Sequence, residues 1–347
     1  MRNRLSNVIR RFRRPGLSGT AAGWTQYLPN SASFTVSDYA SIAEQSASTL
    51  RFLRPVSSPG YDFQNASPGS RVSFTTTATS VRVSMFHNDL VRYTADINNQ
   101  FSIGAILVDG VEVKTYQWAQ LWNETGIVTI EISLSAGSKT VTIVWPYWTG
   151  FELRKIEVNT GATFTAPSRP ANKIAVCGDS ISQGATASKV TTTWPYLLAI
   201  AETKQLVNLA NGGATAVATD ANGLTGTGCN VVTYMIGYNN FVAQTLPATF
   251  QTAVQGWITN ARAALPSAAI YVISPIYSPN TGATYQLSNY RSAVQAAELA
   301  AGDANTFYVD GLSIMTNNIN RLYEGAAGIH PNDLGSSEIA TNLSAIV

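Results

Sequence analysis

The chain has 347 residues, 45% of them hydrophobic, so it can bury a sizeable core, and its length favours about two domains. Only 12% of the residues are charged, well below the roughly 25% usual in soluble domains, and Ser, Thr, Asn and Gly supply most of the polar surface. The net charge of +2 offers no bulk electrostatic attraction for nucleic acid. No run of about 18 apolar residues occurs that could span a membrane.

The positive charge is concentrated at the N-terminus. Six arginines lie within the first fourteen residues: Arg2, Arg4, Arg10, Arg11, Arg13 and Arg14. Without them the chain would carry a net charge of −4. Residues 1–19 are therefore interpreted as a basic arm, which either docks on an acidic partner or anionic surface, or is a solvated terminus. The arm lacks the apolar segment of a secretory signal peptide.

Residues 20–158 show strand patterning and almost no helical periodicity. Runs such as 71–76, 80–86 and 126–134 are rich in β-branched residues and alternate between apolar and polar positions. The dipeptide Asp109-Gly110 separates two further runs and predicts a tight hairpin. Many short strands at this spacing predict an antiparallel sandwich of the jelly-roll type. Its tryptophans either fill the core and the domain junction or form a sugar-stacking platform: Trp24, Trp118, Trp122, Trp145 and Trp148.

Residues 159–171 are rich in Pro, Thr and Ser and predict a linker. From residue 172 to 347, short apolar runs alternate with helical patterns, which predicts a doubly wound parallel sheet with helices on both faces. The two cysteines, Cys177 and Cys229, make neither a disulfide framework nor a metal-ligand pattern.

Candidate catalytic groups follow several of these predicted strands. Ser180 ends the first strand in Gly178-Asp179-Ser180, Gly213 lies in the loop after the second, and Asn239 lies in the loop after the third. His330 precedes the last helix and is the one histidine of this domain. Because the carboxyl ends of parallel strands share one edge of the sheet, we expect these groups to meet there. A serine, an imidazole and neutral N–H donors are the components of acyl transfer through a covalent intermediate.

These blocks resemble the SGNH hydrolases, also called the GDSL-type esterase family. That family carries Gly-Asp-Ser, a glycine in the second loop, Gly-x-Asn-Asp in the third and a histidine near the C-terminus. In this chain the blocks are 178–180, Gly213, 237–240 and His330, in the same order. The resemblance implies a three-layer α/β fold, catalysis by Ser180 and His330, and an oxyanion hole formed by Ser180, Gly213 and Asn239. It implies no metal and no organic cofactor.

The sequence departs from the family pattern at two positions. The third block ends in Asn240 where aspartate is usual, and the acid expected three residues before the histidine is replaced by Ala327. Either a backbone carbonyl orients His330, or another acid replaces the missing one. The candidate acids are Glu324, Asp333 and Asp310.

The pairing of a sandwich with this hydrolase domain resembles two-domain carbohydrate esterases that remove acetyl groups from polysaccharides. The sequence therefore predicts a serine esterase acting on an acylated polysaccharide or a small ester. One alternative is a lipase or thioesterase of the same fold, and another is a non-catalytic glycan-binding or virion structural module. The uncharged polar surface and the basic arm are typical of an extracellular or virion-associated protein, either a phage tail component or a bacterial enzyme.

Overall fold

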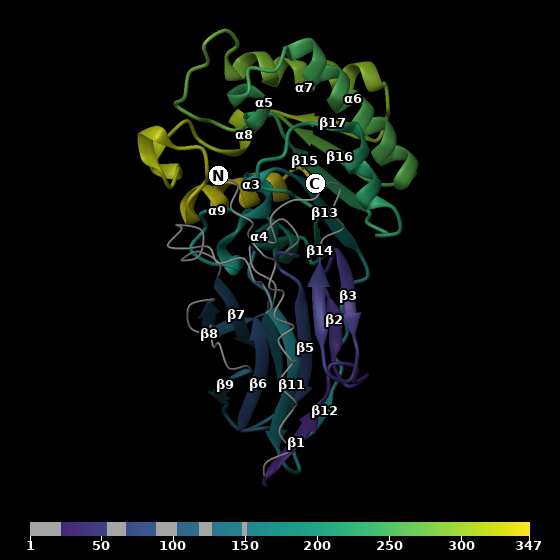
Figure 1. Ribbon diagram of the computed structural model, residues 1–347, viewed down its shortest axis with the longest axis vertical. Coiled ribbons are helices and arrows are strands. Elements are labelled where there is room, and N and C mark those ends of the chain that lie inside the picture. The colour runs from purple at the N-terminus through teal and green to yellow at the C-terminus, as the bar shows by residue number, and fades with distance from the viewer. Residues whose placement is uncertain (1–21, 54–66, 88–102, 118–126, 148–150) are drawn as a thin grey trace, which may run out of the picture.

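The computed structural model describes most of the chain, namely residues 22–53, 67–87, 103–117, 127–147 and 151–347. It is elongated, with an all-β half at one end and an α/β half at the other (Figure 1). The basic arm and three of the tryptophans lie outside the described residues: Trp118, Trp122 and Trp148. Within the described part, no helix is long and apolar enough to cross a membrane.

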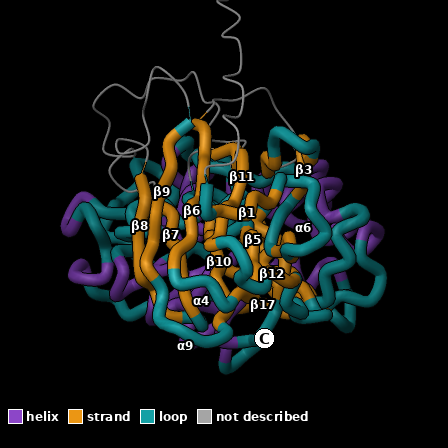
Figure 2. The backbone as a smooth tube through the Cα atoms, turned by 90° about the horizontal axis from the view of Figure 1, so that it is seen from below, coloured by secondary structure: helices purple, strands orange, loops and turns teal. Residues whose placement is uncertain are grey.

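The all-β half consists of two antiparallel sheets. One has the strand order β3-β4-β11-β6-β9, with β1 paired to β11, and the other has the order β12-β5-β10-β7-β8, with β2 paired to β5. The strands are β1 (Trp24–Tyr27), β2 (Thr35–Ser37), β3 (Ser41–Gln45), β4 (Leu50–Leu53), β5 (Arg71–Thr76), β6 (Ser80–His87), β7 (Ile103–Val108), β8 (Val111–Gln117), β9 (Val128–Ser133), β10 (Lys139–Val144), β11 (Phe151–Asn159) and β12 (Phe164–Thr165). Seen from this end of the molecule, the strands fill its middle (Figure 2). The jelly-roll connectivity stays a prediction.

Alternating side chains build the core between the two sheets. In β5, for example, Val72 and Phe74 are fully buried while the residues between them are only partly covered. Trp145 lies in this core, where its ring meets that of Phe52 edge-on at 4.8 Å between centroids. Trp24 instead lies under the guanidinium of Arg82, 3.9 Å from its ring centroid.

The stretch predicted as a linker, residues 159–171, contributes β12 to the sandwich. Phe164 stacks on Tyr27 at 3.7 Å and on Phe74 at 4.5 Å, and this aromatic packing holds the two-residue strand beside β5. The strand pairing of the sandwich therefore extends to Thr165.

The α/β half contains a five-stranded parallel sheet of order β14-β13-β15-β16-β17. Its strands are β13 (Lys173–Gly178), β14 (Gln205–Asn208), β15 (Val231–Met235), β16 (Ala269–Ile273) and β17 (Thr306–Val309). The chain moves from β13 to β14 on one side and then to β15 on the other, so the strand order reverses at β13. Ligands of open α/β sheets bind at such a reversal, beyond the carboxyl ends of the strands. The predicted α/β fold with a central parallel sheet is confirmed.

Helices cover both faces of this sheet (Figure 1). They are α3 (Ser180–Gln183), η2 (Val190–Thr192), α4 (Trp194–Ala201), η3 (Ala218–Leu224), α5 (Tyr238–Val242), α6 (Pro247–Ala264), α7 (Leu287–Ala301), α8 (Gly311–Ile314), η4 (Ile319–Arg321), η5 (Gly325–Ala327) and α9 (Asp333–Ser344). Helix α6 shows why these helices pack on the sheet. Its apolar side chains recur at helical spacing and are buried in the core of the α/β half, as at Phe250, Val254 and Trp257. Helices α3, α4 and α9 lie on the side nearer the sandwich.

The two halves share a packed interface. The backbone N–H of Leu206 in β14 donates to Asp38 Oδ1 of the sandwich at 2.7 Å. Lys189 Nζ pairs with Glu112 at 2.7 Å across the same boundary. Between these contacts lies an apolar cluster with members from both halves: Ala105, Leu107, Val144, Val190 and Tyr196.

Candidate active site

The nucleophile turn begins where β13 ends. Gly178 has a φ of +139°, and a Cβ at this position would lie 2.2 Å from the carbonyl oxygen of Met235, so only glycine fits. Asp179 then caps helix α3, because its Oδ1 accepts the N–H of Ile181 at 3.0 Å. Ser180 therefore occupies the first position of a helix, where the backbone N–H has no partner within the helix.

Ser180 and His330 meet across 150 residues of sequence. Ser180 Oγ lies 2.8 Å from His330 Nε2, and His330 Nδ1 lies 2.7 Å from Glu324 Oε1. The three side chains form one continuous hydrogen-bonded chain. A serine hydroxyl, an imidazole and a carboxylate in this order are the arrangement that lets imidazole take the serine proton.

A closed loop brings Glu324 back to the histidine. Leu322 and Pro331 form an antiparallel bridge, and the N–H of Tyr323 donates to the carbonyl of His330 at 2.9 Å. Glu324 Oε2 accepts the backbone N–H of His330 at 3.2 Å. The carboxylate thus contacts both the backbone and the ring of the same histidine.

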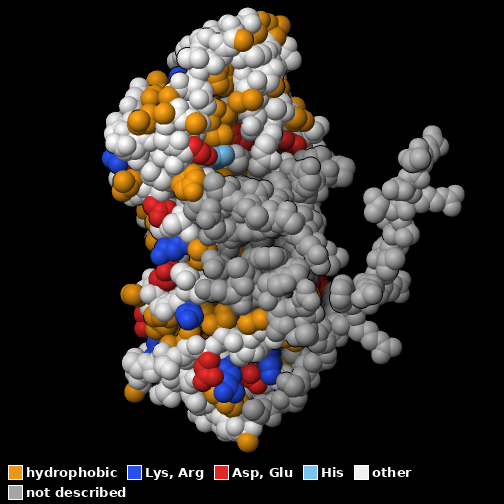
Figure 3. Space-filling view, turned by 60° about the vertical axis from the view of Figure 1, so that its left-hand side comes forward, with side chains coloured by type: hydrophobic (Ala, Val, Ile, Leu, Met, Phe, Trp, Pro, Cys, Tyr) orange, Lys and Arg blue, Asp and Glu red, His pale blue; other side chains and the backbone are white. Residues whose placement is uncertain are grey.

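The environment of Glu324 favours its ionised form. Burial by itself would raise the pKa of this carboxyl, but the hydrogen bonds and the charge of His330 outweigh burial and hold the pKa below its usual value. The side chains of His330 and Glu324 are 17% and 28% exposed. A histidine with acidic side chains beside it is visible on the surface of the α/β half in Figure 3.

The other two candidate acids lie elsewhere. Asp333 accepts hydrogen bonds from the N–H of Ser188 at 2.7 Å and the hydroxyl of Thr192 at 2.8 Å. Asp310 caps helix α8 by accepting the N–H of Leu312 at 3.0 Å. Among the acids considered from the sequence, Glu324 is the one that contacts His330.

The candidate oxyanion donors come from three loops at the same sheet edge. Within the described part of the chain, the backbone N–H groups of Ser180 and Gly213 have no hydrogen-bond partner. Gly213 has a φ of +79°, a conformation that suits glycine, and a Cβ there would meet nothing within 4 Å. A glycine is therefore favoured at position 213 by the backbone conformation and not by a lack of room for a side chain.

The amide of Asn239 is oriented by its neighbours. Its Nδ2 donates to the carbonyl of Ala214 at 2.9 Å, and Asp179 Oδ2 lies 3.4 Å from the same nitrogen. Asn240, which stands where the family pattern has aspartate, is buried and its Oδ1 accepts the N–H of Ala216 at 3.0 Å. Both asparagines thus connect the third loop to the second loop.

Asp179 is the acid closest in sequence to the nucleophile. Burial raises its pKa to about 6, although the N–H of Ile181 and the nearby His330 favour the ionised form. A carboxyl with this pKa changes its charge in the range where imidazole catalysis operates.

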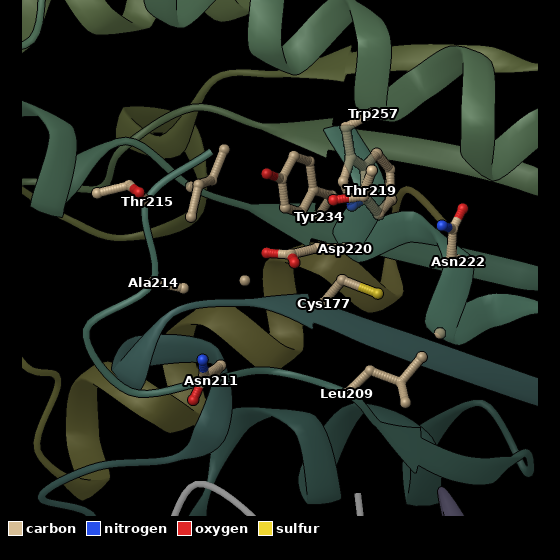
Figure 4. A pocket seen from close by; sticks show the side chains of 13 residues that line it. Cys177, Leu209, Asn211, Ala214, Thr215, Thr219, Asp220, Asn222, Tyr234 and Trp257 are labelled. Carbon is tan, nitrogen blue, oxygen red and sulfur yellow. The ribbon is translucent and has the colours of Figure 1, made fainter. Parts of the chain in front are cut away.

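A cavity of about 370 Å³ is lined in part by Gly178 of the nucleophile turn and by Asn211, Ala214 and Thr215 of the second loop (Figure 4). Its wall includes Gly178 and Asn211 on one side and the stacked rings of Tyr234 and Trp257 on another. Polar groups are mixed with apolar ones, and Asp220 lies between Tyr234 and Cys177 in this view. Within the described residues, no group of three or more His, Cys, Asp or Glu side chains is arranged to hold a metal ion.

One buried polar residue near the nucleophile was not singled out from the sequence. Gln183 lies at the end of α3 and is completely buried, and its Oε1 accepts the N–H of Gly212 at 2.9 Å. The sequence feature that could have indicated this residue is its position: a glutamine three residues after the candidate nucleophile, within the same short helix.

Residues 176–337 match the GDSL-like lipase/acylhydrolase family. No curated protein sequence matches the chain. Among solved structures, the salicylyl-acyltransferase SsfX3 from a tetracycline biosynthetic pathway is similar over 94% of this chain and 98% of its own, with 20% identity and a TM-score of 0.81. A family two carbohydrate esterase from Cellvibrio japonicus is similar over 93% and 96%, with 15% identity and a TM-score of 0.70.

A third similar structure is a family two carbohydrate esterase from Clostridium thermocellum in complex with cellohexaose. It covers 90% of this chain and 97% of its own, with 15% identity and a TM-score of 0.66. At these identities the structural likenesses show a shared fold over both halves of the chain. Together with the family match, they confirm the resemblance of this chain to an SGNH hydrolase and to carbohydrate esterases.

Proposed function

We propose that this chain is a serine esterase that removes acyl groups from carbohydrate, and that the acyl group is acetyl. The observation that carries the proposal is the continuous chain from Ser180 Oγ through the imidazole of His330 to the carboxylate of Glu324, with contacts of 2.8 and 2.7 Å. Glu324 is assigned the role of the acid that the sequence left open.

In the proposed reaction, Ser180 Oγ attacks the ester carbonyl while His330 Nε2 takes the hydroxyl proton. The tetrahedral intermediate collapses, the bond to the alcohol oxygen breaks, and His330 returns the proton to the leaving alcohol. A water molecule, deprotonated by His330, then attacks the acyl-Ser180 ester. The bond to Ser180 Oγ breaks, His330 returns the proton to that oxygen, and the carboxylic acid leaves. Ionised Glu324 stabilises the imidazolium formed in each half of the cycle.

The developing oxyanion is assigned to three donors: the N–H groups of Ser180 and Gly213 and the amide of Asn239. Two observations support this assignment. Among the described residues, neither N–H group has a hydrogen-bond partner, and all three donors lie in loops that follow the carboxyl ends of neighbouring parallel strands. One hydrogen of the Asn239 amide is bonded to the carbonyl of Ala214 at 2.9 Å, whereas the contact of Nδ2 with Asp179 Oδ2 is long, at 3.4 Å. The second hydrogen is therefore the one assigned to the substrate.

Carbohydrate is favoured as the substrate class because several similar structures are carbohydrate esterases, one of them in complex with cellohexaose. A lipase or thioesterase would need an apolar acyl pocket. The cavity of about 370 Å³ is not assigned as such a pocket, because its lining includes neither Ser180 nor His330. With a polysaccharide as the substrate, we expect the enzyme to act outside a cell or at a virion surface. The docking of the basic arm on an acidic partner stays a prediction.

A second candidate function is acyl transfer to an alcohol other than water. It is favoured by the similarity to the salicylyl-acyltransferase, which has the highest TM-score of the structures named here. Both reactions pass through the same acyl-Ser180 ester and differ only in the acceptor.

The test uses the full chain, Ser180→Ala and His330→Ala with nitrophenyl acetate, acetylated xylan and a fluorophosphonate probe. We expect turnover by the wild type, loss of about a thousandfold or more in both variants, and labelling that requires Ser180. Alcohol acceptors added to the assay distinguish transfer from hydrolysis by their acylated products. A wild-type chain that is neither active nor labelled would refute the esterase and support a non-catalytic glycan-binding or structural module.

A further inference from the structure

One buried side chain connects the nucleophile helix, the second loop and the sandwich. Gln183 ends α3, three residues after Ser180, and is fully buried. Its Oε1 accepts the N–H of Gly212 at 2.9 Å, and its Nε2 lies 3.4 Å from the carbonyl oxygen of Tyr147. Tyr147 belongs to the sandwich, three residues after β10.

The carboxamide suits this position because it accepts at one end and donates at the other. The N–H of Gly212 donates to the oxygen of the Gln183 amide and the Tyr147 carbonyl lies beside its nitrogen, so both contacts favour the same orientation of the amide. A carboxylate in its ionised form cannot donate to Tyr147, and an apolar side chain can serve neither group. Leaving a buried N–H or carbonyl without a partner is costly.

Gly212 immediately precedes the proposed oxyanion donor. The N–H of Gly212 belongs to the peptide unit between Asn211 and Gly212, one unit before the peptide that carries the Gly213 N–H. Holding this unit restricts the loop at Gly212 and so helps to hold the direction of the Gly213 N–H. The rest of the loop is held by backbone bonds on either side: the N–H of Asn211 donates to the Gly178 carbonyl at 2.9 Å, and that of Ala214 donates to the Asn211 carbonyl at 3.0 Å.

The other end of the connection is anchored in the sandwich. The N–H of Trp145 donates to the carbonyl of Ser70 at 2.8 Å, which ties this segment to the sandwich. The buried hydroxyl of Tyr147 donates to the carbonyl of Ala187 at 3.2 Å, so Tyr147 contacts the chain just after α3 at a second point.

We propose that Gln183 is a positioning residue through which the sandwich fixes the oxyanion loop, so that the sandwich is part of the catalytic unit and not a separable module. The inference rests on the proposed function, because it assigns Gly213 the role of an oxyanion donor. Gln183 acts through Gly212 and Gly213 and does not itself contact the substrate.

The test compares Gln183→Met with Gln205→Met in the full chain. Gln205 is also a buried glutamine of the α/β half, and its side chain donates to the backbone carbonyl of Pro170. It lies at the amino end of β14, whereas the candidate catalytic residues lie beyond the carboxyl ends of the strands. We expect Gln183→Met to lower kcat on nitrophenyl acetate by about ten- to a hundredfold with KM within about threefold, and to slow fluorophosphonate labelling equally. Gln205→Met should keep kcat within about threefold, although both variants lose a buried hydrogen bond.

Gln183→Glu provides the second readout. When protonated, its carboxyl can accept from Gly212 and donate to Tyr147, so its kcat relative to the wild type should rise as the pH falls. A packing role would not produce this rescue.

Wild-type kcat in Gln183→Met, or equal losses in the two methionine variants, would overturn the inference while leaving the esterase intact. If Gln183→Met does not fold, a Gln183→Glu variant whose relative kcat is independent of pH would overturn it. A wild type without turnover and without labelling would overturn the proposed function and this inference with it.

Discussion

Within the candidate site, the ionised carboxylate of Glu324 acts most directly on the orientation and protonation of the His330 imidazole. Its carboxylate lies 2.7 Å from His330 Nδ1 and also accepts the backbone N–H of the same residue. In the proposed mechanism this carboxylate selects the tautomer that leaves Nε2 to accept the proton of Ser180, and it stabilises the imidazolium.

Replacing Glu324 by glutamine should remove the charge and keep the shape. We expect Glu324→Gln to lower kcat by about a hundred- to ten-thousandfold with little change in KM, since triad acids contribute less than the nucleophile but still substantially. Asp333→Asn is the matched control, because Asp333 contacts Ser188 and Thr192 instead of the histidine. Steady-state kinetics on nitrophenyl acetate measures both. A Glu324→Gln variant within about threefold of the wild type would instead favour a Ser–His dyad.

Asp179 should make the stability of the protein depend on pH. Its pKa is raised by burial from 3.8 to about 6, so between these values the folded state holds a proton that the unfolded state has lost. Stability therefore falls as the pH rises through this window, and the full cost, about 3 kcal/mol, is present above it.

Asp179→Asn should remove this cost, since an asparagine can still cap α3. We expect the variant to gain up to about 3 kcal/mol in the free energy of unfolding at pH 8 and almost nothing at pH 4. Urea unfolding of both proteins from pH 4 to pH 8 measures the difference. Asp310→Asn, which changes the cap of α8 in the same way, is the control. A difference that does not vary with pH would contradict the assignment of the titration to Asp179.

At the scale of the elements, the regular helices and buried strands were readable from the sequence. In α6, apolar residues at helical spacing predict both the helix and its buried face, and the short apolar runs of the parallel sheet are bounded by turn residues. β12 was not predicted, because Phe164 and Thr165 lie in a stretch rich in turn residues. The strand exists because Phe164 packs between Tyr27 and Phe74, which are more than eighty residues away from it in the sequence.

The candidate site was readable only in part, for a related reason. Parallel strands bring their carboxyl ends to one edge, so the approach of Ser180 and His330 follows from strand order. The partner of the histidine does not, because it depends on the path of the loop between Leu322 and Pro331, which hydrogen bonds determine. Gln183 was missed for the same reason, since its importance lies in a contact with the sandwich. The catalytic roles themselves stay predictions.

At the scale of the whole molecule, the sandwich and the α/β half complete each other's hydrogen bonding. β14 is an edge strand of the parallel sheet, and the N–H of its Leu206 is satisfied by Asp38 from the sandwich at 2.7 Å. The same carboxylate lies 3.4 Å from Arg71, whose guanidinium also covers the ring of Tyr196 in α4. Because this edge strand obtains an acceptor from the other half, we expect the folding of the two halves to be coupled.

Replacing Asp38 should therefore destabilise both halves together. We expect the wild type to melt in one calorimetric transition, and Asp38→Ala to lower its midpoint at a cost of about 3 kcal/mol, because it leaves the buried Leu206 N–H without its acceptor and Arg71 without its ion-pair partner. Asp38→Asn should cost less, since its amide oxygen can still accept from Leu206 and asparagine tolerates the φ of +59° found here. Two separate transitions in the wild type would show that the halves fold independently. An unchanged midpoint in Asp38→Ala would show that the contact with Leu206 does not contribute to the stability of the whole molecule.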